Sequence, residues 1–260
     1  DTDRSRGLGD VYKRQIIITG LQEGITTTSI VIPDTIDNIP VTEILKKAFI
    51  GRAITDIKLG KNIKEVGEGA FDRCDKLKSV IWNNACEKIP EYCFAECLSL
   101  KHFDFFNIKI IEKGAFFNSG LKEIHLPSSV KEISEASFFN CTDLNQVIWD
   151  CNEKIVSKSC FCNCYSLKQF NFLNIRELKK GAFAGSGLTS VTLKKRTAVD
   201  QNCFAYCDQL KKVEWLSDHS IVDKVFENCQ NLKEVIISDK VRNIAVDAFK
   251  GCPNVEFTFV

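Results

Sequence analysis

The chain has 260 residues, a net charge of +1 and 44% hydrophobic residues, which is typical of a soluble globular protein with enough apolar material for a continuous core. This balanced charge gives no support for binding to nucleic acid or to an anionic membrane surface, since either partner favours an excess of lysine and arginine. No run of about 18 apolar residues occurs, so the sequence predicts no transmembrane helix. The chain also contains no methionine, which we interpret as the sign of a fragment or a processed product.

The first fifteen residues fit no pattern found later in the chain. Residues 10–15, DVYKRQ, resemble the in-frame translation of a transposon-end adapter used in sequencing libraries. We therefore interpret residues 1–15 as an adapter artefact or a disordered tail, and their basic residues are not read as a targeting signal. The protein proper is expected to begin near Ile16 and to form a single repeat domain over residues 16–260.

From there the chain repeats with a period of about 22 residues. The repeat is marked by ten phenylalanines, at Phe49, Phe71, Phe94, Phe116, Phe138, Phe161, Phe183, Phe204, Phe226 and Phe249. Three residues after seven of them stands a cysteine, namely Cys74, Cys97, Cys141, Cys164, Cys207, Cys229 and Cys252. Arg52, Ser119 and Ser186 occupy the same place in the other three units. A leucine follows, with an apolar residue three positions later, so each unit reads AFxxCxxLxxVxL.

A longer period of three units lies over the first. Trp82, Trp149 and Trp215 are 67 and 66 residues apart. The segment LSLKHFDFFNIKIIEKGAFFNSGL in block 75–141 also matches YSLKQFNFLNIRELKKGAFAGSGL in block 142–207. We infer that the array grew by copying three-unit blocks.

Each unit predicts one short strand and one return turn. The segment LxxVxW and its variants alternate apolar and polar residues with β-branched and aromatic content, which indicates a strand with one buried face. The segment ending in Ala-Phe follows Gly69, Gly114 and Gly181 in three units, and we interpret it as a tight helical turn. A unit of this size cannot bury its own apolar face, so successive units must stack. The predicted fold is α/β, a solenoid of about ten 22-residue units, each a short strand plus a tight helical turn.

The sequence CFCNC at residues 160–164 places three cysteines at alternate positions, a spacing that can indicate a metal site. Cys164, however, is the repeated cysteine of its unit, and Cys160 precedes the phenylalanine as Cys93 and Cys203 do, so that only Cys162 is new. Stacked residues lie about 4.8 Å apart, whereas disulfides favour Cβ atoms about 3.8 Å apart. We therefore expect buried free thiols that behave as small hydrophobic side chains. A metal or redox function for these three cysteines is the alternative, but no second cluster with zinc-ligand spacing occurs, and no cofactor is predicted.

The sheet face predicts a binding surface, because its outward side chains can vary while the inward rows are fixed. The first outward row is Ser79, His102, Glu123, Gln146, Gln169, Ser190, Lys212 and Glu234. The second is Ile81, Asp104, His125, Ile148, Asn171, Thr192, Glu214 and Ile236. Such a mixture suits a protein or peptide ligand better than a phosphate backbone. The candidate binding residues are His102, Asp104, Glu123, His125, Gln146, Ile148, Gln169 and Asn171.

A metal site on this face is a further hypothesis. Stacking of two units would place His102 beside Glu123 and Asp104 beside His125, and two imidazoles with two carboxylates suit a divalent ion such as zinc. The alternative is a pair of exposed ion-pair contacts worth about 0–1 kcal/mol.

Units such as SGLKEIHLPSSVKEISEASFFNCTDL, together with the entry segment IVIPDTIDNIPVTEILKKAF, resemble the BspA-type leucine-rich repeat family over about residues 25–260. The cysteine-containing FxxC pattern is most similar to the protozoan-parasite branch. The resemblance implies a right-handed leucine-rich repeat solenoid. It also implies a cell-surface or secreted protein that binds extracellular matrix, host cells or other microbes, with no catalytic motif to transfer.

The favoured function is a non-enzymatic protein-binding or adhesion scaffold, with a protein or a cell-surface or extracellular-matrix component as its ligand. No phosphate-binding loop is present, Gly67-Glu68-Gly69 lacks the third glycine of a dinucleotide site, and only three histidines occur. A cysteine–histidine nucleophile is an alternative that no spacing in the sequence favours. Three alternatives remain open: a structural spacer within a longer surface protein, an inert solvated face and the metal-binding patch.

Overall fold

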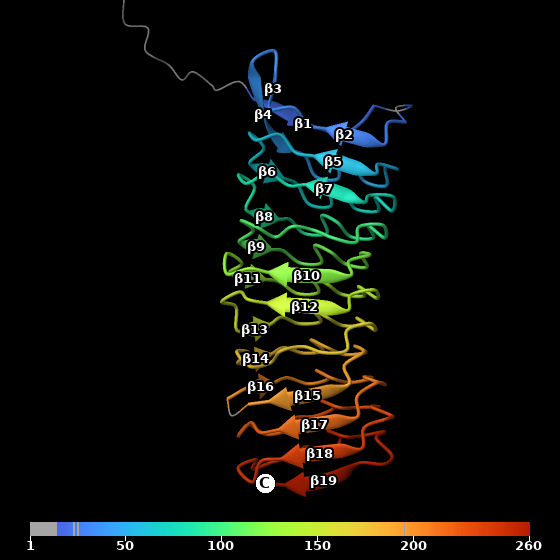
Figure 1. Ribbon diagram of the computed structural model, residues 1–260, viewed down its shortest axis with the longest axis vertical. Coiled ribbons are helices and arrows are strands. Elements are labelled where there is room, and N and C mark those ends of the chain that lie inside the picture. Colours follow the sequence, from blue (N-terminus) through green and yellow to red (C-terminus); the bar gives the residue numbers. More distant parts are fainter. Residues whose placement is uncertain (1–14, 23, 25, 195) are drawn as a thin grey trace, which may run out of the picture.

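The computed structural model describes residues 15–22, 24, 26–194 and 196–260, and within these ranges the chain winds into an elongated β-solenoid (Figure 1). Ten turns contain the repeated phenylalanines, and described residues before them, 16–22 and 26–31, belong to an earlier turn whose Ile18 carbonyl accepts a hydrogen bond from the Leu45 amide. The adapter interpretation of residues 1–15 concerns, apart from Gln15, a segment outside the described residues. No helix in the described ranges is long and apolar enough to cross a membrane.

One side of the solenoid is a ladder of parallel strands of three or four residues, which we call the long-strand ladder. Its strands are β2 (Ser29–Val31), β5 (Asp56–Lys58), β7 (Ser79–Ile81), β10 (Glu123–Leu126), β12 (Gln146–Trp149), β15 (Ser190–Leu193), β17 (Lys212–Trp215), β18 (Glu234–Ile237) and β19 (Glu256–Phe259). The register sets Val191, Val213 and Val235 side by side, and all three are buried. Inward residues therefore align from turn to turn, as the repeat predicted.

A second side is built from shorter parallel strands, the short-strand ladder. Its two-residue strands are β6 (Glu65–Val66), β8 (Lys88–Ile89), β9 (Ile110–Ile111), β11 (Glu132–Ile133), β13 (Ile155–Val156), β14 (Glu177–Leu178) and β16 (Ala198–Val199). At the N-terminal end, β1 (Ile16–Ile18) and β6 both pair in parallel with β4 (Ile39–Ile44). The strand β3 (Thr35–Ile36) forms an antiparallel hairpin with β4 through Asp37 and Asn38, both in the left-handed region.

The third side is a stack of tight turns around the repeated phenylalanines, and here the predicted helical turn is wrong. The described residues contain strands and turns but no helix, so the fold is a β-solenoid and not an α/β structure. Nine of the ten turns have positive φ two residues before the phenylalanine, and all ten have it two residues after. The latter residues are Gly51, Arg73, Glu96, Asn118, Asn140, Asn163, Gly185, Tyr206, Asn228 and Gly251. Two left-handed residues within five prevent a right-handed helix.

The backbone of these turns explains why they stack. In the turn around Phe161, the amides of Phe161 and Asn163 donate to carbonyls of Ala182 and Ala184 in the next turn, both at 2.8 Å. The intervening Cys162 amide donates to the Ser159 carbonyl of its own turn at 3.3 Å. Successive amides therefore donate hydrogen bonds alternately to the next turn and to their own turn. This pattern satisfies the buried backbone amides without a helix.

The core is a column of stacked aromatic rings. Successive repeated phenylalanines lie 5.2–5.8 Å apart between ring centroids, with interplanar angles of 5–22°. Such offset stacking adds to the free energy gained by removing the rings from water. The column fixes the spacing of the turns, and the outward side chains of the long-strand ladder inherit that spacing.

Candidate functional site

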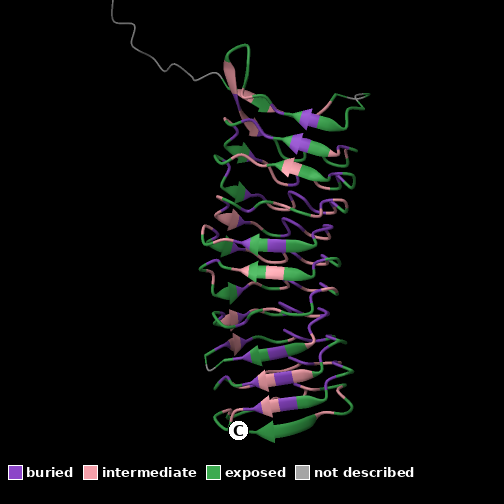
Figure 2. Ribbon diagram, viewed as in Figure 1, coloured by how far each residue is buried: buried purple, intermediate pink, exposed green. Residues whose placement is uncertain are grey.

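The outward rows predicted from the sequence lie on the solvent side of the long-strand ladder. Buried and exposed residues alternate along these strands (Figure 2). Along β10, for example, Ile124 and Leu126 are buried whereas Glu123 and His125 are exposed. All eight candidate binding residues are exposed, and Gln146 and Ile148 of β12 lie beside Glu123 and His125.

This face is interrupted at two places that the sequence analysis did not predict. Residues 101–105 and 168–172 form no strand, so the ladder divides into the sheets β2-β5-β7, β10-β12 and β15-β17-β18-β19. The two gaps are 67 residues apart and share one local structure. The Phe106 amide donates to Asp104 Oδ1 at 2.9 Å, and the Leu173 amide donates to Asn171 Oδ1 at 3.0 Å. In each gap, an Asp or Asn side chain thus stabilises a local turn by accepting a hydrogen bond from the amide two residues later.

Large aromatic side chains lie behind each gap. Phe103 and Phe105 in the first gap, and Phe170 and Phe172 in the second, stand where other turns have mostly valine, isoleucine and leucine. Within each pair the ring centroids lie 5.0 and 4.9 Å apart. Since these rings are larger than aliphatic side chains, we attribute the loss of strand pairing at the gaps to the space they require.

A tryptophan in the preceding turn completes each aromatic cluster. Trp82 lies 6.0 Å from Phe103, and Trp149 lies 5.6 Å from Phe170, between ring centroids. The indole nitrogens of Trp82 and Trp149 each donate to the carbonyl four residues later, at 2.8 Å. Two of the three tryptophans that mark the three-unit period thus precede a gap, whereas Trp215 is followed by the paired strand β18.

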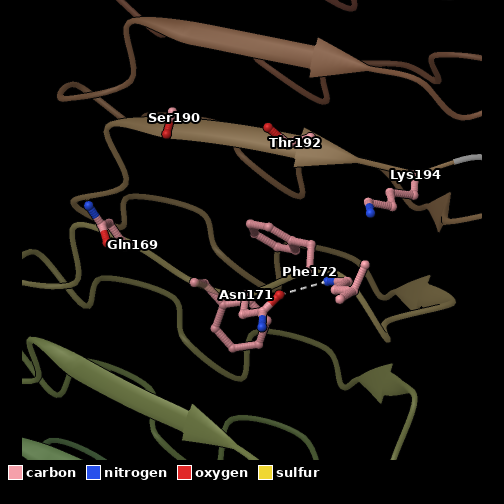
Figure 3. Close-up of a pocket in the computed structure, with 8 residues that line it drawn as sticks. Gln169, Asn171, Phe172, Ser190, Thr192 and Lys194 are labelled. Atoms are coloured by element: carbon pink, nitrogen blue, oxygen red, sulfur yellow. Dashed lines mark hydrogen bonds between the residues drawn. The ribbon is translucent and has the colours of Figure 1, made fainter.

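Shallow hollows lie next to the gaps. At the first gap, a hollow of about 310 Å³ is lined by His102, Phe103, Glu123, Ile124, His125, Gln146 and Ile148. At the second gap, residues 169–171 separate two hollows. The one on the side of β15, about 390 Å³, is lined by Gln169, Phe170, Asn171, Phe172, Leu173, Ser190, Thr192 and Lys194 (Figure 3). The other hollow, about 490 Å³, is lined by Gln169, Phe170 and Asn171 together with Asn145, Gln146 and Val147.

The structure does not bring the four residues of the metal hypothesis together. His102 Nδ1 lies 3.3 Å from Glu123 Oε1, as expected, but His125 Nε2 lies 2.9 Å from Asp150 Oδ2. Asp104 Oδ1 instead accepts the hydrogen bond from the Phe106 amide of its own turn. In the part of the chain that the structure describes, no group of three or more His, Cys, Asp or Glu side chains is arranged to hold a metal ion.

The cysteines of CFCNC have three different environments. The Cys164 thiol donates to the Phe138 carbonyl of the preceding turn at 3.2 Å, and the six equivalent cysteines make the same bond at 3.0–3.2 Å. Cys160 is buried at a position that is alanine in five of the ten turns, and Cys162 is half-buried. Burial raises the pKa of Cys162 to about 11 and that of Cys160 further. All thirteen cysteines are free thiols.

Four residues of the second gap were missed as candidates in the sequence. Ser190 and Thr192 were placed on the outward rows but not selected, while Leu173 and Lys194 lie outside those rows. The signal was present in the matched segments, where FDFFNI and FNFLNI occupy equivalent positions. An Asp or Asn between two aromatic residues at the same place in two blocks indicates a repeated turn.

Three solved structures have a similar fold. A leucine-rich repeat protein from Bacteroides ovatus is 25% identical, with a TM-score of 0.63 over 91% of this chain and 76% of its own. The T. pallidum leucine-rich repeat protein TpLRR is 26% identical, with a TM-score of 0.60 over 75% of this chain and 83% of its own. The pneumococcal vaccine antigen PcpA, at 15% identity and a TM-score of 0.60 over 90% of this chain and 74% of its own, is similar in fold alone.

A comparison with curated proteins finds no match. The family model described as BspA type leucine-rich repeat region, in six copies, matches residues 22–145 and 137–256. Membership in the protozoan branch stays a prediction, whereas the family itself follows from a match over most of the described chain. The chain belongs to the BspA-type leucine-rich repeat family.

Proposed function

We propose that the protein is a non-enzymatic adhesion scaffold that binds a protein or a cell-surface or extracellular-matrix ligand through the outward face of the long-strand ladder. The observation that carries the proposal is the hollowed outward face, whose side chains vary between turns while the inward rows stay fixed. Solenoids of stacked repeats use such extended faces for binding. Membership in a leucine-rich repeat family supports a scaffold over a catalyst.

Isolated exposed aliphatic side chains among polar neighbours support a macromolecular ligand. Ile81 and Ile148 are 55% and 40% exposed in the second row, each one turn before a gap. Protein interfaces combine apolar contacts of this kind with a polar surround. The charged residues of the face have both signs, as in the ion pairs from Lys212 to Glu214 and Glu234, so the ligand needs no strong charge.

The test is binding of the full chain to an immobilised preparation of extracellular-matrix proteins. Arginine at Gln146 and Gln169 places two cations on the proposed face, and we expect at least a tenfold loss of binding. The matched control is Gln201→Arg/Gln230→Arg, in the turn stack, which adds the same charge elsewhere. Equal binding by both variants, or no binding by the unmodified chain, contradicts the proposal. A chain that serves only as a spacer gives the second result.

A further inference from the structure

Six uncharged hydrogen-bonding side chains lie together at the second gap, across three consecutive turns. They are Asn145, Gln146, Gln169, Asn171, Ser190 and Thr192, and all are exposed. Within the described residues, Lys194 is the one charged side chain that lines either hollow. Charged residues make up 27% of the chain, so a lining of this size without a carboxylate is unusual, and the nearest one in contact is Glu214, whose Oε2 accepts a bond from Thr192 at 3.1 Å.

Half of these side chains keep their hydrogen-bonding capacity for a ligand. Gln146, Gln169 and Ser190 make no side-chain hydrogen bond to another residue in the described ranges, and they occupy equivalent positions in successive turns. Asn171 uses its Oδ1 for the Leu173 amide and leaves its amide group. Each glutamine offers two donors and one acceptor oxygen, and the serine offers a hydroxyl.

The remaining lining is apolar and rigid. Phe170 lines both hollows, and it is held by ring contacts of 5.6 Å to Trp149, 4.9 Å to Phe172 and 4.9 Å to Phe183. Leu173 is 53% exposed at the end of the gap turn. Figure 3 shows Gln169 and Asn171 on one side of the hollow and Ser190 and Thr192 on β15 at the other, with Lys194 at its end.

We propose that the second gap is a subsite for an uncharged saccharide, a ligand class that deepens, and rests on, the proposed function of the long-strand face. A sugar ring combines hydroxyl groups, which pair with amide and hydroxyl side chains, and C–H faces, which pack on aromatic and aliphatic ones. An acidic or phosphorylated ligand is disfavoured, because Lys194 is the one cation that lines either hollow within the described residues. An extended peptide that adds to a strand edge is also disfavoured, because residues 168–171 already occupy the space between β12 and β15.

The first gap supplies an internal control with the same backbone and different chemistry. His102, Asp104, Glu123 and His125 stand 67 residues before Gln169, Asn171, Ser190 and Thr192. The earlier set is engaged in contacts from His102 to Glu123 and from His125 to Asp150. Since the gap turn forms on Asp104 as well as on Asn171, exchanging the two sets preserves the local structure.

The experiment incubates the full chain with a printed array of neutral and sialylated oligosaccharides. The brightest neutral oligosaccharide is then titrated calorimetrically. The test variant, Gln169→His/Asn171→Asp/Ser190→Glu/Thr192→His, gives the second gap the side chains of the first. The control, His102→Gln/Asp104→Asn/Glu123→Ser/His125→Thr, makes the reverse change. We expect the unmodified chain and the control to bind neutral oligosaccharides, and the test variant to lose at least tenfold in affinity at an unchanged melting temperature.

The inference is overturned if no neutral oligosaccharide binds, or if the test variant binds as the unmodified chain does. Should the fourfold variant fail to fold, Gln169→Ala and Ser190→Ala are tested singly, and unchanged affinity in both has the same meaning. Matrix binding that persists without oligosaccharide binding, and that is removed by proteolysis of the matrix, rejects the saccharide but leaves the proposed function. Oligosaccharide binding without matrix binding rejects the proposed matrix adhesion but leaves the saccharide subsite.

Discussion

The repeated cysteine has a specific task at the scale of single residues. Its thiol is small enough for the aromatic column and donates to the carbonyl of the phenylalanine one turn earlier, as Cys164 does to Phe138. Serine takes the same position at Ser119 and Ser186, where its hydroxyl lies 3.4 Å from the thiol of the next turn. Eight of the ten turns therefore bury a thiol or hydroxyl at this position, whereas Arg52 and Cys252 are half-buried.

Removing one sulfur atom should have different costs at two neighbouring positions. Cys160→Ala copies Ala182 of the next turn and should lower the free energy of unfolding by about 0.5–1.5 kcal/mol. Cys164→Ala also removes the bond to Phe138 and should cost about 1 kcal/mol more. Denaturant unfolding measures the difference. Equal costs would show that the thiol bond contributes nothing to stability.

The thiols also predict the pH dependence of stability. Burial raises the pKa of Cys141, Cys86 and Cys151 to about 11, from 9.0 in the unfolded chain. The folded state therefore holds these protons longer, and the stabilisation is complete below pH 9 and lost as the pH rises to about 11. We expect a constant midpoint of unfolding between about pH 7 and 8.5 and a steep fall above pH 9.

A variant with fewer buried thiols provides the control for this pH dependence. Cys93→Ala/Cys160→Ala/Cys203→Ala removes three thiols whose pKa is raised by burial, at a position where five of the ten turns have alanine. Its loss of stability above pH 9 should be less steep by about 4 kcal/mol per pH unit, since each thiol contributes about 1.4. An equally steep fall would show that these three thiols do not contribute to the pH dependence.

At the scale of the element, the turn stack depends on left-handed residues that are not all suited to it. Glycine or asparagine fills seven of the ten positions two residues after the phenylalanine, whereas Arg73, Glu96 and Tyr206 fill the others. A side chain with a Cβ atom raises the energy of this conformation by about 1 kcal/mol. At this position, Arg73, Glu96 and Tyr206 are therefore strained relative to the glycines and asparagines of the other turns.

Relief of that strain is measurable at Arg73. We expect Arg73→Gly to raise the free energy of unfolding by about 0.5–1 kcal/mol, because its φ of 58° suits glycine. Its one ion pair, 3.6 Å from Glu96, is exposed and adds little. Lys76→Gly, exposed and outside the left-handed region, should lower stability by a similar amount. A thermal melt of both variants would contradict the assignment if they shifted in the same direction.

The same elements show what the sequence could and could not predict. Alternation of apolar and polar residues predicted the long strands outside the two gaps and the outward direction of both rows, because a period of two residues indicates a strand with one buried face. The turn was misread because Ala-Phe after a glycine also suits a helix, although Asn140, Asn163 and Asn228 indicated left-handed positions. The gaps were missed because Phe103 and Phe105 occupy the same apolar positions as valine and leucine in other turns. A pattern of apolar and polar residues contains no information on the size of the side chains.

At the scale of the whole molecule, the column of phenylalanines joins all ten turns. Phe161 is fully buried between Phe138 and Phe183, while Phe249 is half-buried and follows Phe226 at the end of the column. Phe161→Ala should cost about 3–5 kcal/mol as a change from large to small in the core. Phe249→Ala should cost less than half as much. Calorimetric melts of the two variants test the ranking, and a smaller cost at Phe161 would contradict the column as the source of stability.

The hydrogen bonds between turns join residues about 22 positions apart, as in the bond from Phe161 to Ala182. Closure of each turn therefore needs only a short loop, and the two ends of the molecule never meet. Folding should resemble the propagation of a zipper from any stable nucleus, with a cost for each new turn and no global closure step. Damage at a central turn would then uncouple the halves into two separate melting transitions, where a globular domain of the same length would unfold as one.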